Sequence, residues 1–408
     1  MSRKKKGRKK HSPSFYASFV AFSGAAALFL GSLLYLAFLS GGRPSQPPFE
    51  ERSSPLSRQI TGIDQVIYTC LYKAKVPQEN ILFLEVKQRH RDRAEWDFTE
   101  LLIRPPREES VSALEKELKR MLSSRAPGLR FRTEKGSHDE TVVHVYAGTY
   151  YTHQIRIRPD HGAESTNQEI PASTRGVGVD ARVLANRESK PKVAIIIDDL
   201  GYDLDLAKSF MALDLAVSLS VLPMAPFTEK IVEAAQEKNC DIMLHLPMEP
   251  VTSRHEDAGP GALLTNMSEK EIKRLLEEHL KRVPGARGVN NHMGSRFTES
   301  EDKMGILMNE LKRRRLFYVD SRTTSRTVAL EVAQRLGVAA TKRNVFLDND
   351  PTREAMTFQL QRLLAISRQS GKAVGIAHPH PETAAFLRLN VPLLKREASV
   401  VSVSEVVE

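Results

Sequence analysis

Aromatic residues are scarce in this chain of 408 residues, with a single Trp and 6% aromatics in all. So few aromatic side chains give no sign of the stacking platform by which many proteins hold single-stranded nucleic acid. Cysteine is scarcer still, and Cys70 and Cys240 are too few for a disulfide framework. We expect two separately buried thiols, and a single bridge in an oxidising compartment is the alternative. Hydrophobic residues at 41% and charged residues at 27% exclude wholesale disorder, so the length predicts two or three folded domains.

The positive charge of the chain is concentrated at its N-terminus. Seven Lys or Arg and no acidic residue lie in residues 1–14, so the net charge of +10 leaves only +3 for the rest. An uncharged run over residues 15–40 follows, longer than the roughly 20 residues with which a helix crosses a membrane. Basic residues before such a segment favour a cytoplasmic N-terminus.

We therefore predict a single-pass protein of the cytoplasmic (inner) membrane. The N-terminus would lie inside and the later domains outside, in the periplasm, with no nucleic-acid partner. A cleaved signal peptide is the alternative, but the apolar run is longer than an ordinary signal core and no A-x-A-like cleavage site clearly follows it.

A small α+β domain is predicted over residues 56–159, after a Gly/Pro/Ser-rich spacer at 41–55. Apolar stripes at helical spacing lie at residues 60–71 and 111–122, and strand-like runs lie at 81–86, 98–103, 129–133, 141–146 and 151–158. No catalytic constellation stands out, because the His residues of this part are isolated. We expect the domain to act as a spacer or to contact a protein partner.

A larger domain is predicted over residues 191–408, after a linker without periodicity at 160–190. Seven short apolar runs alternate with amphipathic helices, and they lie at residues 193–197, 216–222, 241–246, 288–291, 316–320, 338–341 and 372–377. Continuous apolar runs of this kind are typical of strands that are buried on both faces of a sheet. The alternation predicts an α/β fold, either a parallel barrel or a doubly wound sheet.

Unusual polar residues follow these predicted strands at their carboxyl ends. They are Asp198 and Asp199 after the first, His245 at the third, Asn290, Asn291 and His292 at the fourth, Asp320 and Ser321 at the fifth, and His378 at the seventh. Active sites of α/β barrels assemble at this rim. Any one such residue could cap a helix or simply be a satisfied polar group. Their coincidence indicates a site.

Two imidazoles and one carboxylate at such a rim make a three-ligand site for Zn²⁺ or a related divalent ion, with a fourth position for water. A carboxylate outside the ligand set could act as general base, and a remaining His could protonate a leaving group. Acyl hydrolysis is the chemistry that these parts favour. The spacings between the residues match no short metal motif.

Several motifs together resemble the divergent polysaccharide deacetylases, over about residue 191 to the C-terminus. The motifs are IIIDDLG at 195–201, HLPME at 245–249, GPGALLT at 259–265, NNHMGS at 290–295, DS at 320–321 and the strand end at His378. The resemblance implies a distorted (β/α)7 barrel. It also implies that Asp198 is the general base, Asp199 and His245 are metal ligands, and His378 is the acid that protonates the departing amine.

The chain departs from the ordinary deacetylases at one ligand position. Those enzymes carry a second metal-binding His four residues after the first, where this chain has Glu249. His292 could complete the ligand set, or Glu249 could bind the metal directly. We favour His292, because imidazole suits zinc. Asp320 could orient the acid His378 or could cap a helix.

The sequence thus predicts a membrane-anchored, metal-dependent hydrolase that removes N-acetyl groups from an envelope polysaccharide such as peptidoglycan. The alternative is a binding or scaffold protein of the cell envelope that keeps the deacetylase fold without turnover. Glu249 motivates this alternative, since it stands where a metal ligand is expected.

Overall fold

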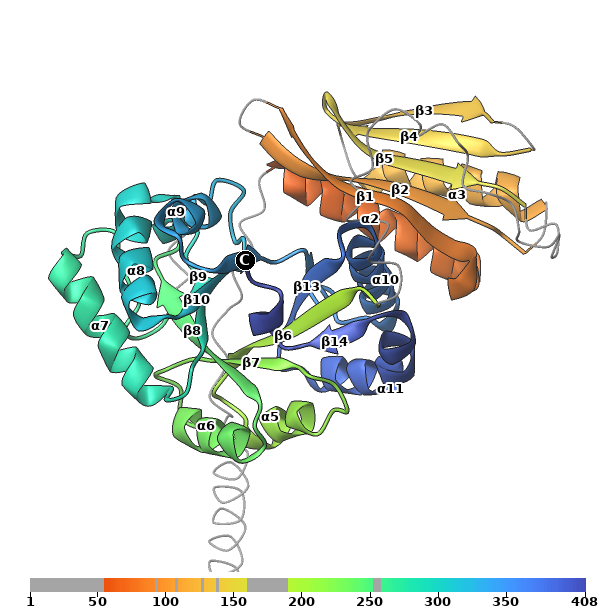
Figure 1. Cartoon of the computed structure of the whole chain (residues 1–408). Helices are drawn as coiled ribbons and strands as arrows, with labels where there is room; N and C mark the ends of the chain where they lie inside the picture. Colours follow the sequence, from red (N-terminus) through yellow and green to blue (C-terminus); the bar gives the residue numbers. More distant parts are fainter. Residues whose placement is uncertain are drawn as a thin grey trace, which may run out of the picture. The chain divides into compact units, whose positions relative to one another are not determined.

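A computed structural model describes residues 55–91, 94–106, 109–125, 128–136, 139–159, 190–251 and 258–408. An α+β domain precedes residue 160 and an α/β domain follows residue 189 (Figure 1). The predicted tail and membrane segment, the spacer up to residue 54 and nearly all of the predicted linker lie outside the described residues. Within the described ranges, no helix is both long enough and apolar enough to cross a membrane.

Five strands of the small domain form one sheet in the order β1-β2-β5-β4-β3. The elements are α2 (Pro55–Lys73), η1 (Gln78–Asn80), β1 (Ile81–Arg91), β2 (Ala94–Ile103), α3 (Glu109–Arg125), β3 (Leu129–Lys135), β4 (Thr141–Ala147) and β5 (Tyr150–Ile157). Strands β2 and β5 run parallel, and the other neighbours are antiparallel. The two helices and five strands predicted for this part are confirmed.

Helices α2 and α3 cover the same face of this sheet (Figure 1). Ile63 and Ile67 form one turn of the buried stripe of α2, and Leu114 and Leu118 do the same on α3. Both stripes belong to one apolar cluster with the strand residue Ile155. Burial of these side chains holds the helices on the sheet, since each is worth about 1.5–3 kcal/mol.

The C-terminal domain is built on parallel strands joined by helices. Its elements are β6 (Lys192–Leu200), α5 (Leu204–Met211), β7 (Ser218–Val221), α6 (Thr228–Glu237), β8 (Asp241–Met248), α7 (Glu269–Arg282), β9 (Gly288–Met293), η3 (Phe297–Glu299), α8 (Glu301–Arg314), β10 (Phe317–Asp320), α9 (Ala329–Leu336), β11 (Ala340–Lys342), β12 (Val345–Phe346), α10 (Arg353–Ser370), β13 (Lys372–Ala377), α11 (Pro381–Glu397), β14 (Ser399–Val401) and η4 (Val403–Glu405). The strands follow the order β11-β10-β9-β8-β7-β6-β13-β12, and β14 pairs with the first half of β6. The sheet curls into a half-barrel, with helices around its outside (Figure 1).

The last residues of the chain fill the inside of the half-barrel. Val403 and Val406 are buried in one apolar cluster with strand residues such as Ile196 and Val374. The amide of Ala340 in β11 donates to the carbonyl of Glu408 at 2.8 Å. The interior is therefore a packed core, as in larger α/β barrels, and the polar residues gather at the carboxyl ends of the strands.

All seven strands predicted for this domain are confirmed. The sheet has nine strands in the described residues, because the short strands β12 and β14 join it. The structure shows the predicted α/β fold of this domain as a curled parallel half-barrel. Runs of two or three residues such as β12 and β14 carry too little periodicity to be found in the sequence.

A buried ionic cluster joins α10 of the half-barrel to the small domain. Arg362 donates to Asp64 of α2 at 2.9 Å and to Asp97 of β2 at 3.1 Å. The other oxygen of Asp64 lies 3.1 Å from Nε2 of His153. Asp64 and Arg362 are 4% and 6% exposed, so each charge depends on the other for compensation.

Replacing Arg362 with alanine is expected to lower the free energy of unfolding by about 3–5 kcal/mol, since it leaves a buried carboxylate without its cation. Urea denaturation of wild type and variant measures this loss. The matched control is Arg368→Ala on the same helix, because Arg368 pairs with Glu397 at the surface. That variant should cost less than about 1 kcal/mol. Equal losses for the two variants would refute the structural role given to the buried cluster.

Candidate metal and catalytic site

Asp198 and Asp199 stand at the carboxyl end of β6, where the strand leaves its regular geometry. Successive residues of a strand normally point to opposite faces. Here the pairing register with β7 shifts between Ile197 and Leu200, and Asp199 has a φ of 54°. Such a bulge with a left-handed residue redirects side chains, and it is common next to active sites. Both carboxylates are thereby buried at the rim, at 2% and 4% exposure.

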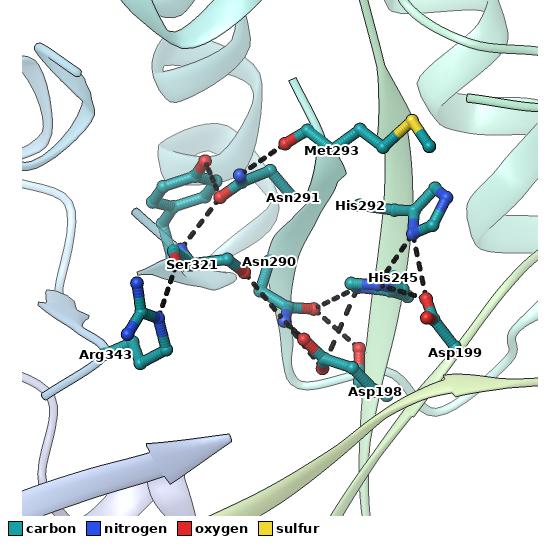
Figure 2. Close-up of polar contacts among 11 residues, drawn as sticks. Asp198, Asp199, His245, Asn290, Asn291, His292, Met293, Ser321 and Arg343 are labelled. Carbon is teal, nitrogen blue, oxygen red and sulfur yellow. Dashed lines mark hydrogen bonds and ion pairs between the residues drawn. The ribbon is translucent and has the colours of Figure 1, made fainter. Parts of the chain in front are cut away.

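His245 and His292 come from the neighbouring strands β8 and β9. Within β9, Asn290 and His292 are two residues apart and share a face, as the strand period requires. His245 pairs with Asn290 in the register of the two strands. The Asn291 side chain points the other way, and its Oδ1 accepts from the backbone amide of Ser321 at 2.9 Å (Figure 2). The period of two thus explains why only alternate residues of NNHMGS reach the site.

Three side-chain atoms converge at this point, and Figure 2 shows both imidazoles turned towards Asp199. Oδ1 of Asp199 lies 2.9 Å from Nε2 of His245 and 2.8 Å from Nδ1 of His292. The two ring nitrogens are 3.2 Å apart. All three residues are buried, and they form a group that could hold a metal ion.

The three residues fit a divalent cation. Oδ1 of Asp199 is buried and accepts no hydrogen bond of adequate geometry from the described residues, although two ring nitrogens lie within 3 Å of it. A cation between the carboxylate oxygen and the two imidazole nitrogens would compensate the buried charge and would be bound by all three side chains. Tetrahedral zinc with bonds of about 2.0–2.2 Å takes this donor set, with a fourth position for water or substrate.

Asn290 orients two of the polar groups around this centre. Its Nδ2 donates to the two carboxylate oxygens of Asp198 at 2.8 and 3.0 Å. Its Oδ1 accepts from the Ser220 hydroxyl at 2.6 Å and lies 3.0 Å from Nδ1 of His245. Because an amide oxygen only accepts, Nδ1 of His245 carries the hydrogen and Nε2 presents its lone pair. Outer partners of this kind commonly fix the tautomer of a metal-binding His.

The surrounding charges shift the pKa values of the Asp198 and Asp199 carboxylates in opposite directions. Burial raises the pKa of Asp198, and the charge of Asp199 adds to this rise against the opposing effects of His245 and His378. Burial also disfavours ionisation of Asp199, but the His292 and His245 rings hold its pKa well below the ordinary value. Burial lowers the pKa of His245, and the two carboxylates more than reverse this. Asp199 is therefore the permanent anion, and Asp198 has the higher proton affinity.

His378 follows β13 and is held by Asp348, which follows β12. One oxygen of Asp348 lies 2.9 Å from Nδ1 of His378, and the other accepts from the His378 amide and the Thr383 hydroxyl, both at 2.7 Å. Burial lowers the pKa of His378, but the carboxylates of Asp348, Asp199 and Asp198 together raise it more strongly, to about 9. The Asp348 carboxylate, which is bonded to the ring, makes the largest of these contributions. His378 is thus a protonated ring whose Nε2 can donate.

Asp320 does not take the orienting position considered for it from the sequence. Its carboxylate accepts from the Arg322 amide at 2.8 Å and from the Thr327 hydroxyl at 2.9 Å. These bonds fix the turn after β10, whereas Asp348 holds the His378 ring. The assignment of Asp320 as a partner of the acid is corrected to Asp348.

Asp348→Asn should lower turnover by at least about 10²-fold and leave metal content unchanged, because it disturbs only the proton donor. An acid with a pKa near 9 in the folded protein acts below that pH and fails above it. Without the carboxylate this pKa falls, so the alkaline limb of the kcat–pH profile should move to lower pH. Asp320→Asn is the control and should leave that limb in place. An unmoved limb in Asp348→Asn would contradict the pairing.

Glu249, the alternative metal ligand, is turned away from the three converging atoms. Its Oε2 accepts from the Thr265 amide at 2.5 Å and from the Thr265 hydroxyl at 2.6 Å, and Oε1 accepts from Arg296 at 3.1 Å. Burial raises the pKa of Glu249, but these bonds bring it below the ordinary value. The carboxylate therefore ties together the segments after β8 and β9, and His292 completes the group around Asp199.

Two residues of the site had no role assigned from the sequence, Asp348 and Asn290. Asp348 follows Val345–Phe346, a strand too short to mark the residue after it as a strand end. Asn290 lies in the NNHMGS motif, and its distance of two residues from His292 could have placed both side chains on one face. The two-residue period of the strand could therefore have predicted that Asn290 lies in the site.

Comparisons with known proteins agree with the fold and the motifs. Residues 195–407 match the family described as divergent polysaccharide deacetylase. The uncharacterized protein YibQ of Escherichia coli (strain K12) is 34% identical over 213 residues, which cover 52% of this chain and 66% of that relative. An uncharacterized protein of Haemophilus influenzae (strain ATCC 51907 / DSM 11121 / KW20 / Rd) is 33% identical over 214 residues, covering 52% of this chain and 75% of that one.

Among solved structures, an uncharacterized protein from Agrobacterium tumefaciens C58 matches with a TM-score of 0.51 and 22% identity. The match covers 53% of this chain and 89% of that one, and it supports the fold of the C-terminal domain alone. The family match extends over half of the sequence and includes the strands that carry Asp198, Asp199, His245, His292 and His378. The chain is therefore a member of the divergent polysaccharide deacetylase family.

Proposed function

We propose that the protein is a metal-dependent amidase that removes N-acetyl groups from an envelope polysaccharide, with peptidoglycan or a similar amino-sugar polymer as substrate. The observation that carries the proposal is the convergence of Asp199, His245 and His292 within 3.2 Å of one another, beside a buried carboxylate that remains outside the group. Family membership supports a polysaccharide substrate. The distorted (β/α)7 barrel of that family is the finer description that we propose for the half-barrel.

Asp199, His245 and His292 would hold the metal, for which we propose Zn²⁺. When bound, such an ion acidifies water and polarises an acyl oxygen. Asp198 is the proposed general base, because its carboxylate is held by Asn290 and its pKa is raised by burial. His378 is the proposed acid, because Asp348 keeps its ring charged and fixes its direction.

The reaction that these groups would perform is hydrolysis of an N-acetyl amide. Asp198 takes one proton from the attacking water, whose oxygen forms a bond to the acyl carbon. His378 gives a proton to the amide nitrogen as the carbon–nitrogen bond breaks. The products are acetate and a free amine on the sugar. Each proton transfer of this kind typically contributes a factor of about 10²–10⁴ to the rate.

The proposal includes the place where the protein works. Residues 15–40 would anchor the chain in the inner membrane, with the basic tail in the cytoplasm and both folded domains in the periplasm. A polymer of the cell envelope is then within reach of the site. Enzyme reporters fused after residue 55 test this, since a reporter active only in the periplasm should be active there and a cytoplasmic reporter inactive.

The test of function uses the purified full-length chain. We expect about one equivalent of zinc or a similar metal per chain, and release of acetate from oligomers of N-acetylglucosamine. Chelation should stop the release, and added Zn²⁺ should restore it. A folded protein that binds these oligomers, holds no metal and releases no acetate would instead support the alternative, a scaffold protein without turnover. Glu249 in place of a second His is the observation that favours that alternative.

A further inference from the structure

A cavity of about 520 Å³ lies between α2 and β2 of the small domain and the segments that follow β10 and β12 of the half-barrel. Cavities of roughly 300–1,000 Å³ are typical of ligand sites in proteins. The residues that line it include none of the three proposed metal ligands, nor Asp198 or His378. The cavity is therefore a second place where a ligand could sit, and both domains contribute to its wall.

The cavity lies next to His378, the proposed proton donor of the catalytic site. Phe346 lines it, and the ring of Phe346 lies 5.7 Å from the ring of His378. Leu347 and Asn349 also line it, and they flank Asp348, which holds His378. The segment that holds His378 therefore also forms part of the cavity wall.

Three arginines and four carboxylates line the cavity, so the charges in its wall nearly balance. Arg362 pairs with Asp64 and Asp97, and Arg322 pairs with Glu95 at 2.6 Å. Arg343 donates to the backbone carbonyls of Ser321 and Arg322, and the carboxylate of Asp350 accepts from the Tyr68 hydroxyl at 2.5 Å. This near balance of charge suits an uncharged ligand.

The rest of the wall offers hydrogen-bonding groups beside aromatic rings. Gln65 of α2 and Gln359 of α10 line the cavity, together with Trp96 and Tyr68. Amides can both donate and accept, as the hydroxyl groups of a sugar require, and aromatic rings provide an apolar surface. This combination fits an uncharged carbohydrate better than a lipid or a nucleotide.

We propose that this cavity is a second sugar-binding subsite, which holds units of the polymer that are linked to the reacting one. The proposal rests on the proposed deacetylase function for the identity of the polymer. Because the cavity lies next to His378, the sugar units bound in it would lie on the same side of the reacting unit as the proton donor. The small domain completes the substrate site by supplying α2 and β2. A neutral linear polysaccharide is the class of ligand that the wall fits.

The test measures binding of N-acetylglucosamine oligomers, from a disaccharide to a hexasaccharide, to the full-length Asp198→Asn protein. Affinity should rise about tenfold or more with oligomer length. The Gln65→Ala/Gln359→Ala double variant should weaken binding of the hexasaccharide by about five- to tenfold, the cost of two neutral hydrogen bonds, and leave the disaccharide unaffected. The matched control is Gln59→Ala on α2, because Gln59 does not line the cavity.

Affinity that is independent of oligomer length, or unchanged in the double variant, would overturn the subsite. Acetate release by the wild-type chain is measured in parallel, so that the two proposals fail separately. Release of acetate without length dependence rejects the subsite alone. Length-dependent binding that needs the two glutamines, without any acetate release, retains the subsite and rejects the deacetylase function.

Discussion

Asp199→Ala is expected to release the metal and abolish acetate release. The variant removes the oxygen that lies within 3 Å of both ring nitrogens, and with it the only anion among the three proposed ligands. Loss of an outer partner of a metal ligand already costs about 10–100-fold in affinity. Loss of a ligand itself should cost more than about 10²-fold. His245→Ala should behave in the same way.

Metal content per chain, measured after dialysis by elemental analysis, tests this prediction. Glu249→Gln is the matched control, because Glu249 is the alternative ligand and its carboxylate is bonded to Thr265 and Arg296. This variant should retain the metal. The ligand set would be wrong if Glu249→Gln lost the metal while Asp199→Ala kept it.

Asp198→Asn should give the opposite pattern, with metal content unchanged and turnover lowered by about 10²–10⁴-fold. The substitution keeps an oxygen that can accept from Nδ2 of Asn290, so the local geometry is preserved. It removes only the capacity to take a proton from water. The two adjacent aspartates are thus predicted to differ in function because the bulge at the end of β6 directs them to different partners.

Steady-state kinetics and metal analysis on the same preparation of Asp198→Asn separate the two roles. Near-wild-type turnover would show that the proton acceptor lies elsewhere. Loss of metal would show that Asp198 contributes to metal binding, directly or through Asn290.

Much of the fold could be predicted from the sequence, because the strands of the half-barrel are continuous apolar runs. Val193–Ile197 is buried throughout, and such a run has few alternatives to a strand covered on both faces. The helices between the runs have apolar stripes and caps, such as the capping box of Ser268 with Glu271. Curvature and the two shortest strands depend on tertiary packing, which local pattern does not encode.

Part of the candidate site could also be predicted, because the apolar runs show where each strand ends. Residues at the carboxyl ends of neighbouring parallel strands must lie near one another, so Asp199, His245 and His292 could be grouped from the sequence. Which carboxylate holds His378 depends on the irregular segment after β12. Asp348 in that segment had no role assigned from the sequence, and Asp320 was considered because it ends a recognisable strand. The sequence favoured His292 over Glu249 on ligand chemistry alone, because the position of Glu249 depends on how the segment after β8 folds back onto Thr265.

The most direct test of the central claim is a crystal structure of the zinc-loaded protein, with anomalous scattering recorded at the zinc edge. The claim predicts one strong anomalous peak at about 2.0–2.2 Å from Oδ1 of Asp199, Nε2 of His245 and Nδ1 of His292. A peak bound by Glu249, or no peak near these three atoms in crystals that contain zinc, would contradict it.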